Sequence, residues 1–219
     1  MFSHINFRLV EEDTTRKTNE FYQRLSLWNG DMSNLSNILQ EMSEYYTSDK
    51  DDMAWYYKKT KYNEKIGYVL PSVLMLEQIK AFQHKIGIPI CDFGTGSGLM
   101  THLLSLMSCQ IYGVDLVSNE KAGKFCNEKV QLFEFKDFQV PTNSILLMSW
   151  GLCYNVINEF VTNGGKYAII IGEEEGGCTY PGWNYFDDND EWSIDSVYKI
   201  PNFPYAKTRL SFNFKKLKL

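Results

Sequence analysis

The stretch Asp-Phe-Gly-Thr-Gly-Ser-Gly, from Asp92 to Gly98, limits most tightly how this chain can fold. Its three glycines stand at alternate positions, after a short apolar run and before a run with apolar residues at helical spacing that begins at Leu99. Glycine is needed where the backbone turns with a positive φ or where a ligand touches the main chain. The pattern therefore predicts a strand, a tight turn and a helix capped by Ser97, at the carboxyl edge of a parallel sheet.

The spacing of the glycines distinguishes between two kinds of ligand site. A dinucleotide fingerprint, Gly-x-Gly-x-x-Gly, would need glycine where this chain has Leu99, which argues against a nicotinamide enzyme. Here the third glycine comes one residue early, and an acid precedes the first glycine by two. This arrangement resembles motif I of the class I S-adenosylmethionine-dependent methyltransferases, although a tight turn with no ligand stays open. In that family the acid, here Asp92, lies near the amino group of the methionine part of S-adenosylmethionine (SAM).

The resemblance implies a SAM site built from the glycine turn and two further stretches of the chain. The glycine turn would contribute Asp92, Phe93, Gly94, Thr95, Gly96 and Gly98. Asp115 ends a second predicted strand, 110–116, where a carboxylate can accept both hydroxyl hydrogens of a ribose. This position matches motif II of the family, so Asp115 and the adjacent Leu116 are both expected to contact the cofactor. The alternative is that Asp115 is simply an exposed acid at a strand end. Asp137 and Phe138, in a third predicted strand at 129–138, resemble the pair that contacts the adenine in the family.

The acceptor side of the site is predicted at the ends of two apolar strands. Residues 143–151 are continuously apolar, as in a strand buried on both faces, and Trp150 lies where the family has motif IV. Many nitrogen-directed members carry Asp/Asn-Pro-Pro-aromatic there, which this chain lacks. A fifth strand, 166–172, leads into an acidic, glycine-rich loop that begins with Glu173. Glu173 is the candidate acid or base, with a solvated turn as the alternative for the loop. Trp150 is the second catalytic candidate and is also expected to contact the cofactor.

A poorly characterised group of small methyltransferase-like proteins has the most similar pattern. Its members carry a strand ending in Trp-Pro-Pro and another ending in Gly-Glu, followed by Gly-Gly-Cys-Thr. The residues that match are Trp150, Gly172, Glu173, Gly176, Gly177, Cys178 and Thr179. Gly151 and Leu152 replace the two prolines, which affects the catalytic assignment and not the fold.

The resemblance covers residues 66–219 and implies one α/β domain with the Rossmann-like class I methyltransferase fold. We expect a mostly parallel seven-stranded sheet with helices on both faces and an antiparallel last strand near 209–214. Helices are expected at 73–85, with Ser72 as N-cap, and at 153–161, and a short helix or lid at 181–192. Residues 1–65 carry no resemblance and are predicted to form an N-terminal helical extension or lid, with helices at 14–28 and 33–46.

The amino-acid composition limits which molecules and metals this chain is expected to bind. The net charge of -5 is not that of a nucleic-acid binder. The segment 53–65 interleaves aromatic residues with four lysines, which would suit single-stranded nucleic acid, but an amphipathic segment over the core is favoured. The five cysteines form no Cys-x-x-Cys pair and indicate reduced thiols of a cytoplasmic type of protein. The three histidines lack ligand spacing, so no metal site is expected, and no signal peptide or membrane span is expected either.

The sequence therefore favours a SAM-dependent methyltransferase whose methyl acceptor is not identified. A small molecule or a protein suits the acidic composition better than RNA does. No catalytic Cys-Pro pair of the cytosine C5 type is seen, nor a Lys-Asp-Lys-Glu set of the ribose methyltransferase type. The alternative is a catalytically inactive binding protein that keeps the fold, an idea based on Ser149, which stands where an acid or amide would be expected.

Overall fold

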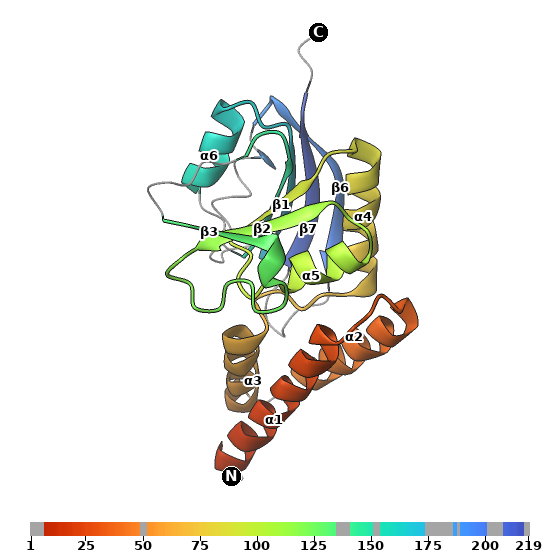
Figure 1. Ribbon diagram of the computed structural model, residues 1–219, viewed down its shortest axis with the longest axis vertical. Helices are drawn as coiled ribbons and strands as arrows, with labels where there is room; N and C mark the ends of the chain where they lie inside the picture. Colours follow the sequence, from red (N-terminus) through yellow and green to blue (C-terminus); the bar gives the residue numbers. More distant parts are fainter. Residues whose placement is uncertain are drawn as a thin grey trace.

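The computed structural model describes residues 7–48, 52–134, 141–150, 154–173, 186–187, 189–200 and 208–216. In these ranges one sheet of seven strands has the order β3-β2-β1-β4-β5-β7-β6 (Figure 1). The strands are β1 (Ile90–Phe93), β2 (Ile111–Leu116), β3 (Val130–Phe133), β4 (Ile145–Ser149), β5 (Tyr167–Glu173), β6 (Trp192–Ile200) and β7 (Thr208–Lys215). β3, β2, β1, β4 and β5 are parallel, and β7 is antiparallel to both of its neighbours. The predicted sheet is confirmed, including its antiparallel last strand.

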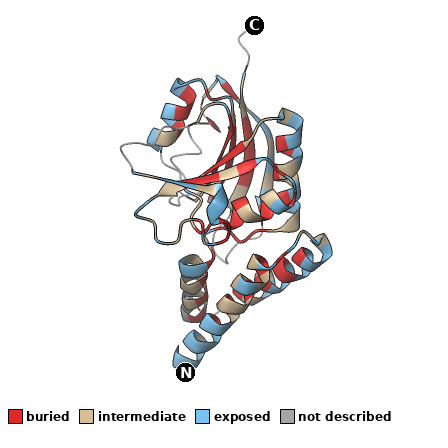
Figure 2. Ribbon diagram, viewed as in Figure 1, coloured by how far each residue is buried: buried red, intermediate tan, exposed pale blue. Residues whose placement is uncertain are grey.

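Helices pack on both faces of this sheet, as predicted. The helices of the described residues are α1 (Phe7–Ser26), α2 (Met32–Thr47), α3 (Asp52–Lys65), α4 (Val73–Ile86), α5 (Leu99–Leu106) and α6 (Tyr154–Thr162), with a short 3-10 turn at Asn127–Lys129. α4 and α5 cover one face, and α6 covers the other (Figure 1). The central strands are buried from both sides, and Ile145 to Met148 of β4 have no exposed surface (Figure 2). Their continuous apolar character therefore reflects two packed faces.

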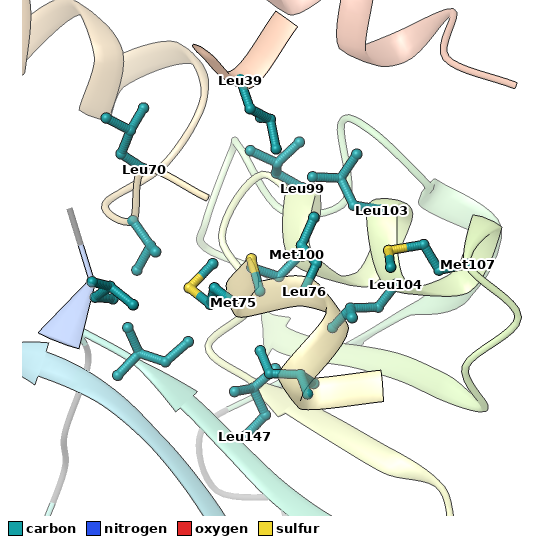
Figure 3. Packing of buried hydrophobic residues seen from close by; sticks show 14 of the residues in the cluster. Leu39, Leu70, Met75, Leu76, Leu99, Met100, Leu103, Leu104, Met107 and Leu147 are labelled. Carbon is teal, nitrogen blue, oxygen red and sulfur yellow. The ribbon is translucent and has the colours of Figure 1, made fainter. Parts of the chain in front are cut away.

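The N-terminal helices share the larger of the two hydrophobic clusters with the sheet. Leu39 of α2 points toward Leu99 and Leu103 of α5 in a layer of buried leucines and methionines (Figure 3). Buried tyrosines connect the helices, since the Tyr46 hydroxyl lies 2.8 Å from Thr18 Oγ1 and the ring centres of Tyr46 and Tyr62 are 4.9 Å apart. The Tyr62 hydroxyl donates to the carbonyl of Val69, in the segment between α3 and α4, at 2.6 Å. The helix expected at 14–28 is α1, which begins at Phe7 and ends at Ser26. Its start was missed because residues 11–20 are all polar and separate the first, apolar turn from the apolar spacing that begins at Phe21.

Local signals at helix ends were correct at α4 and wrong at α5. Ser72 caps α4 by accepting from the Met75 N–H at 3.2 Å, and Gly87 ends it with φ 78°. Ser97, in contrast, does not cap α5, whose N-cap is Gly98 in the left-handed region with φ 81°. The Ser97 hydroxyl instead donates to the Ile66 carbonyl. A partner from a distant part of the chain has replaced the local cap.

The strand β6 was not foreseen: the short helix or lid expected over 181–192 overlaps it only at Trp192, and no element was predicted for residues 193–199. Residues 181–185 and 188 lie outside the described residues, but Trp192 is the first residue of β6. The register of β6 against β7 shifts between Ile194 and Ser196. This irregularity breaks the period-two alternation by which a strand is recognised.

The lysine-rich helix α3 packs as an amphipathic helix. Lys58 is buried, donates to the Tyr45 carbonyl at 2.6 Å and lies 4.0 Å from the centre of the Tyr45 ring. Lys61 forms ion pairs with Glu11 and Glu64. Two of the four lysines of α3 therefore stabilise the helical unit, by which we mean α1, α2 and α3 together. This is expected of lysine stems that lie over a core.

Three cysteines fall within the described residues, and Cys91, Cys109 and Cys126 are all buried free thiols. Burial raises the pKa of both the Cys91 and the Cys126 thiol to about 12, so these groups are neutral and unreactive at neutral pH. No helix in the described ranges has the length and apolar character needed to cross a membrane.

Candidate functional site

The glycine turn between β1 and α5 lies over the carboxyl ends of β1 and β2. Gly94, Gly96 and Gly98 have φ angles of 67°, 57° and 81°, a region that L side chains rarely adopt. The Gly94 and Thr95 N–H groups both donate to the Val114 carbonyl, at 2.9 and 3.1 Å. Each glycine is therefore required by the shape of the turn.

Asp92 is buried beneath this turn, with 2% of its surface exposed. Its Oδ2 accepts from Thr95 Oγ1 at 2.7 Å and from Thr101 Oγ1 at 2.8 Å. Burial raises the pKa of Asp92 to about 6, the two threonine donors oppose that rise, and the nearby Asp115 adds to it. The site thus holds a carboxylate that is ionised at neutral pH but less strongly than usual.

Gly113 of β2 makes room for the threonine that holds Asp92. It lies opposite Asp92 in the register of β1 and β2, and a Cβ at this position would stand 2.9 Å from Thr95 Cγ2 and Oγ1. Neither Gly113 nor Thr101 was foreseen from the sequence. A lone glycine inside a strand pattern is the signal that could have indicated such a close approach.

Asp115 connects the end of β2 to the glycine turn. Its Oδ2 accepts from the Gly96 N–H at 2.7 Å and from Asn119 Nδ2 at 3.0 Å, and its Oδ1 accepts from the Leu116 N–H at 2.8 Å. The structure therefore brings the two predicted acids to one turn from two neighbouring strands. Asn119 is a member of this group that the sequence analysis did not single out.

An open crevice of about 420 Å³, solvent included, lies against the turn. Its floor contains Asp92, Thr95 and the first two glycines, and Ser149 at the end of β4 also lines it. Its other wall is the segment Ile66–Val69, which follows α3 and carries Tyr68 with 57% of its surface exposed. No sequence signal marked this segment, because it joins the crevice through tertiary packing.

The end of β4 has an unusual backbone and an unpaired hydroxyl. Trp150 adopts φ 61°, uncommon for a bulky residue, while its N–H donates to the Ile171 carbonyl at 3.0 Å. The buried Ser149 Oγ has no hydrogen-bond partner in the described part of the chain. Residues with unusual backbone dihedral angles and buried polar groups without a hydrogen-bond partner are found more often at functional sites than elsewhere.

The other predicted site residues are distributed differently. The Phe93 side chain packs with the cluster beneath α6, on the face of the sheet away from α5, and is not part of the crevice lining. Leu116 is half-buried at the end of β2. Glu173 is the last residue of β5 and pairs with Thr208 of β7. Asp137 and Phe138 lie outside the described residues.

Replacing Ser149 with alanine is expected to raise the free energy of unfolding by about 1 kcal/mol, because a buried hydroxyl without a partner costs stability. The matched control is Ser144→Ala, since the buried Ser144 hydroxyl donates to the Pro141 carbonyl at 3.1 Å, and this change should lower stability. Urea denaturation of both variants measures the difference. A loss of stability in Ser149→Ala would contradict the assignment of an unsatisfied hydroxyl.

No protein-family model matches the sequence, and no similar sequence is found among curated proteins. Solved structures are nevertheless similar. A magnesium protoporphyrin IX methyltransferase from Synechocystis PCC 6803 with bound SAM has a TM-score of 0.53 at 11% identity, over 87% of this chain and 98% of that chain. Cofactor-bound Rv0187 from MTB has a TM-score of 0.54 at 8% identity, over 84% of this chain and 98% of that chain. Such likeness shows the fold, which is the Rossmann-like fold of class I SAM-dependent methyltransferases.

Proposed function

We propose that this protein is a SAM-dependent methyltransferase that binds SAM across the glycine turn. The observation that carries the proposal is the hydrogen bond from the Gly96 N–H to Asp115, which places a strand-end carboxylate beside the turn that covers Asp92. The residues present fit the cofactor. A Cβ at Gly94 or Gly96 would meet no atom within 4 Å, so the crevice side of the turn is open to a ligand.

Each carboxylate has a distinct role in this proposal. Asp115 lies at the strand end where a carboxylate can accept the two ribose hydroxyls, in exchange for the contacts that it now makes with Asn119 and Gly96. Asp92, at the floor of the crevice, offers a negative charge to the ammonium group of the methionine part. Asp137 and Phe138 are proposed, from the family resemblance alone, to contact the adenine.

When bound, SAM supplies a methyl group activated by a sulfonium. The remaining task of the chain is to hold the acceptor in line with that methyl, and much of the catalysis can come from this positioning. Ser149, the last residue of β4, lines the crevice and is proposed to form its acceptor side. Trp150, which follows it, is not among the lining residues and is proposed to contribute to the same side. Glu173, at the end of the neighbouring β5, is proposed as the base for an acceptor that must lose a proton.

The acceptor is proposed to be a small molecule or a protein in preference to RNA. The net charge of -5 disfavours a polyanion, and Lys58 and Lys61 of α3 are engaged within the helical unit. Similar structures include an enzyme that acts on a porphyrin and, with a TM-score of 0.50 over 37% of its length, a tRNA (uracil-54, C5)-methyltransferase of Pyrococcus abyssi. Methyltransferases with this fold therefore include one named for a small molecule and one named for an RNA.

A catalytically inactive SAM-binding protein is the second candidate. It is favoured by one observation, that a serine hydroxyl and no acid or amide stands at the end of β4. SAM bound without methylated product, across panels of small molecules, peptides and RNA, would support this candidate. Transfer of a radiolabelled methyl group to any acceptor would exclude it.

Replacing Asp115 with alanine is expected to weaken the binding of S-adenosylhomocysteine (SAH) about 10- to 100-fold, because charged hydrogen bonds of about 1.5–3 kcal/mol to the ribose are lost. Isothermal titration calorimetry measures the change. Glu120→Ala is the control, since Glu120 is an exposed acid in the loop that directly follows β2. Equal affinity of the Asp115 variant and the wild type would overturn the site, as would thermal stabilisation of the wild type by NAD and not by SAH.

A further inference from the structure

The loop that follows β2, residues 117–126, holds the glycine turn from one side. We call it the β2–β3 loop. The Gly123 N–H donates to the Gly96 carbonyl at 3.0 Å, and the Phe125 N–H donates to the Ser97 carbonyl at 2.9 Å. The Cys126 thiol lies 3.3 Å from the Gly98 carbonyl and donates to it. The carbonyl groups of three consecutive residues of the turn, 96–98, thus accept hydrogen bonds from this one loop.

The β2–β3 loop is itself held by the N-terminal helices. The Tyr22 hydroxyl of α1 donates to the Lys124 carbonyl at 3.1 Å, and the ring centres of Tyr22 and Phe125 are 4.6 Å apart. Lys121 Nζ donates to the carbonyl of Asn63 in α3 at 3.3 Å. These contacts join residues far apart in the sequence, so the geometry of the turn depends on helices outside the sheet.

The other side of the turn is held by the same helical unit. The Ser97 hydroxyl donates to the carbonyl of Ile66, the residue directly after α3. A Cβ at Gly67 would stand 3.9 Å from Ser97 Oγ, so this segment runs close to the turn. The glycine turn is therefore placed between two segments, each anchored on α1 or α3.

We propose that Tyr22 is a positioning residue of the cofactor site, which it stabilises by fixing the β2–β3 loop against the glycine turn. The N-terminal helices are then part of the SAM site, and the chain does not divide functionally at residue 65 into an extension and a separate domain. This inference rests on the proposed function, because it concerns the affinity for the same cofactor.

The contacts of Tyr22 suit this role. Its ring contact to Phe125 and its hydroxyl bond to Lys124 hold one segment of the loop at two points. Loss of the ring removes the nearer of the two ring contacts of Phe125 and leaves the one to His102, whose ring centre lies 6.0 Å away. The N–H that Phe125 donates to Ser97 then separates from the turn more easily. Local opening of this kind lowers the fraction of molecules that are competent to bind and reduces the affinity by that fraction.

Tyr45 offers a matched control. It is also a half-buried tyrosine of the helical unit, its hydroxyl donates to Asp13 at 3.0 Å, and Lys58 lies over its ring as Lys65 lies over the ring of Tyr22. Its ring neighbours include Phe21 and Tyr46, which belong to α1 and α2. Changes at Tyr45 should therefore disturb the helices without a direct effect on the β2–β3 loop.

The experiment compares Tyr22→Ala and Tyr22→Phe with Tyr45→Ala and Tyr45→Phe in the full chain. SAH affinity is measured by calorimetry at a temperature where circular dichroism shows every variant to be folded. We expect about tenfold weaker binding in Tyr22→Ala, a loss of about twofold in Tyr22→Phe, which keeps the ring, and less than about twofold in both Tyr45 variants. Hydrogen exchange should accelerate at the Gly123 and Phe125 amides in Tyr22→Ala without SAH, and not in Tyr45→Ala.

The outcomes separate this inference from the proposed function. If the wild type binds SAH and Tyr22→Ala binds it equally well, or no more weakly than Tyr45→Ala, the inference is wrong and the proposed function stands. If the wild type does not bind SAH, both are wrong. Unchanged exchange at Gly123 and Phe125 in Tyr22→Ala would also overturn the inference, because the loop would then not depend on Tyr22.

Discussion

Replacing Asp92 with asparagine is expected to make the protein more stable at neutral pH and, in the same variant, to weaken SAM binding. Burial raises the pKa of this carboxyl from its ordinary 3.8 to about 6, so folding favours its protonated form. The folded chain then binds more protons than the unfolded chain between these two values, and stability falls as the pH rises through them. Above pH 6 the ionised carboxylate costs about 3 kcal/mol relative to the exposed group.

Asparagine keeps an oxygen that can accept from Thr95 and Thr101 but carries no charge. We therefore expect Asp92→Asn to have a higher midpoint of thermal unfolding than the wild type at pH 7.5, by several degrees, with the advantage disappearing below about pH 4. Calorimetric scans across this range test the prediction. A variant that is less stable at pH 7.5 and equally so at pH 4 would contradict it.

The same substitution removes the charge proposed for the ammonium group of SAM. Titration at pH 7.5 should show about tenfold weaker binding or more, since a charge-assisted hydrogen bond is lost. In the wild type, affinity should fall as the pH drops through about 6, the pKa of Asp92, and this dependence should be absent in the variant. Greater stability together with weaker binding would identify Asp92 as a group kept for function at the expense of the fold.

Replacing Gly98 with alanine is expected to lower the free energy of unfolding by about 2–4 kcal/mol. Two causes add together. The residue has φ 81°, where a Cβ is strained, and that Cβ would stand 3.3 Å from Gly123 Cα and 3.2 Å from Cys126 Sγ. The β2–β3 loop would have to move, and with it the contacts that hold the turn.

Gly96→Ala is the matched control, because Gly96 also has a positive φ, 57°, but a Cβ there would meet nothing within 4 Å. It should cost only about 1 kcal/mol from backbone strain. Because Gly96 lines the crevice, its methyl group should nevertheless reduce SAH affinity in a protein that remains folded. Urea denaturation and calorimetry of the two variants measure both effects. Equal destabilisation by the two changes would contradict the packing argument at Gly98.

Much of the sheet could be predicted, because its signals are local. Strands buried on both faces are continuously apolar, as in β4, and Ser72 and Gly87 mark the ends of α4 by interactions within a few residues. β6 could not be predicted in this way, because the shift in its register against β7 interrupts the alternation of its side chains. The strand became recognisable only through its pairing with β7.

For the candidate site, the sequence by itself determined the turn and the two acids at the strand ends, because alternating glycines and the period of the flanking runs act over a dozen residues. The tertiary structure alone decided the partners that come from distant parts of the chain. Ser97 bonds to Ile66, 31 residues away, and Tyr22 bonds to Lys124, 102 residues away. No local pattern encodes such pairs, because they form only when packing of the helices against the sheet brings distant backbone carbonyls within reach of a hydroxyl.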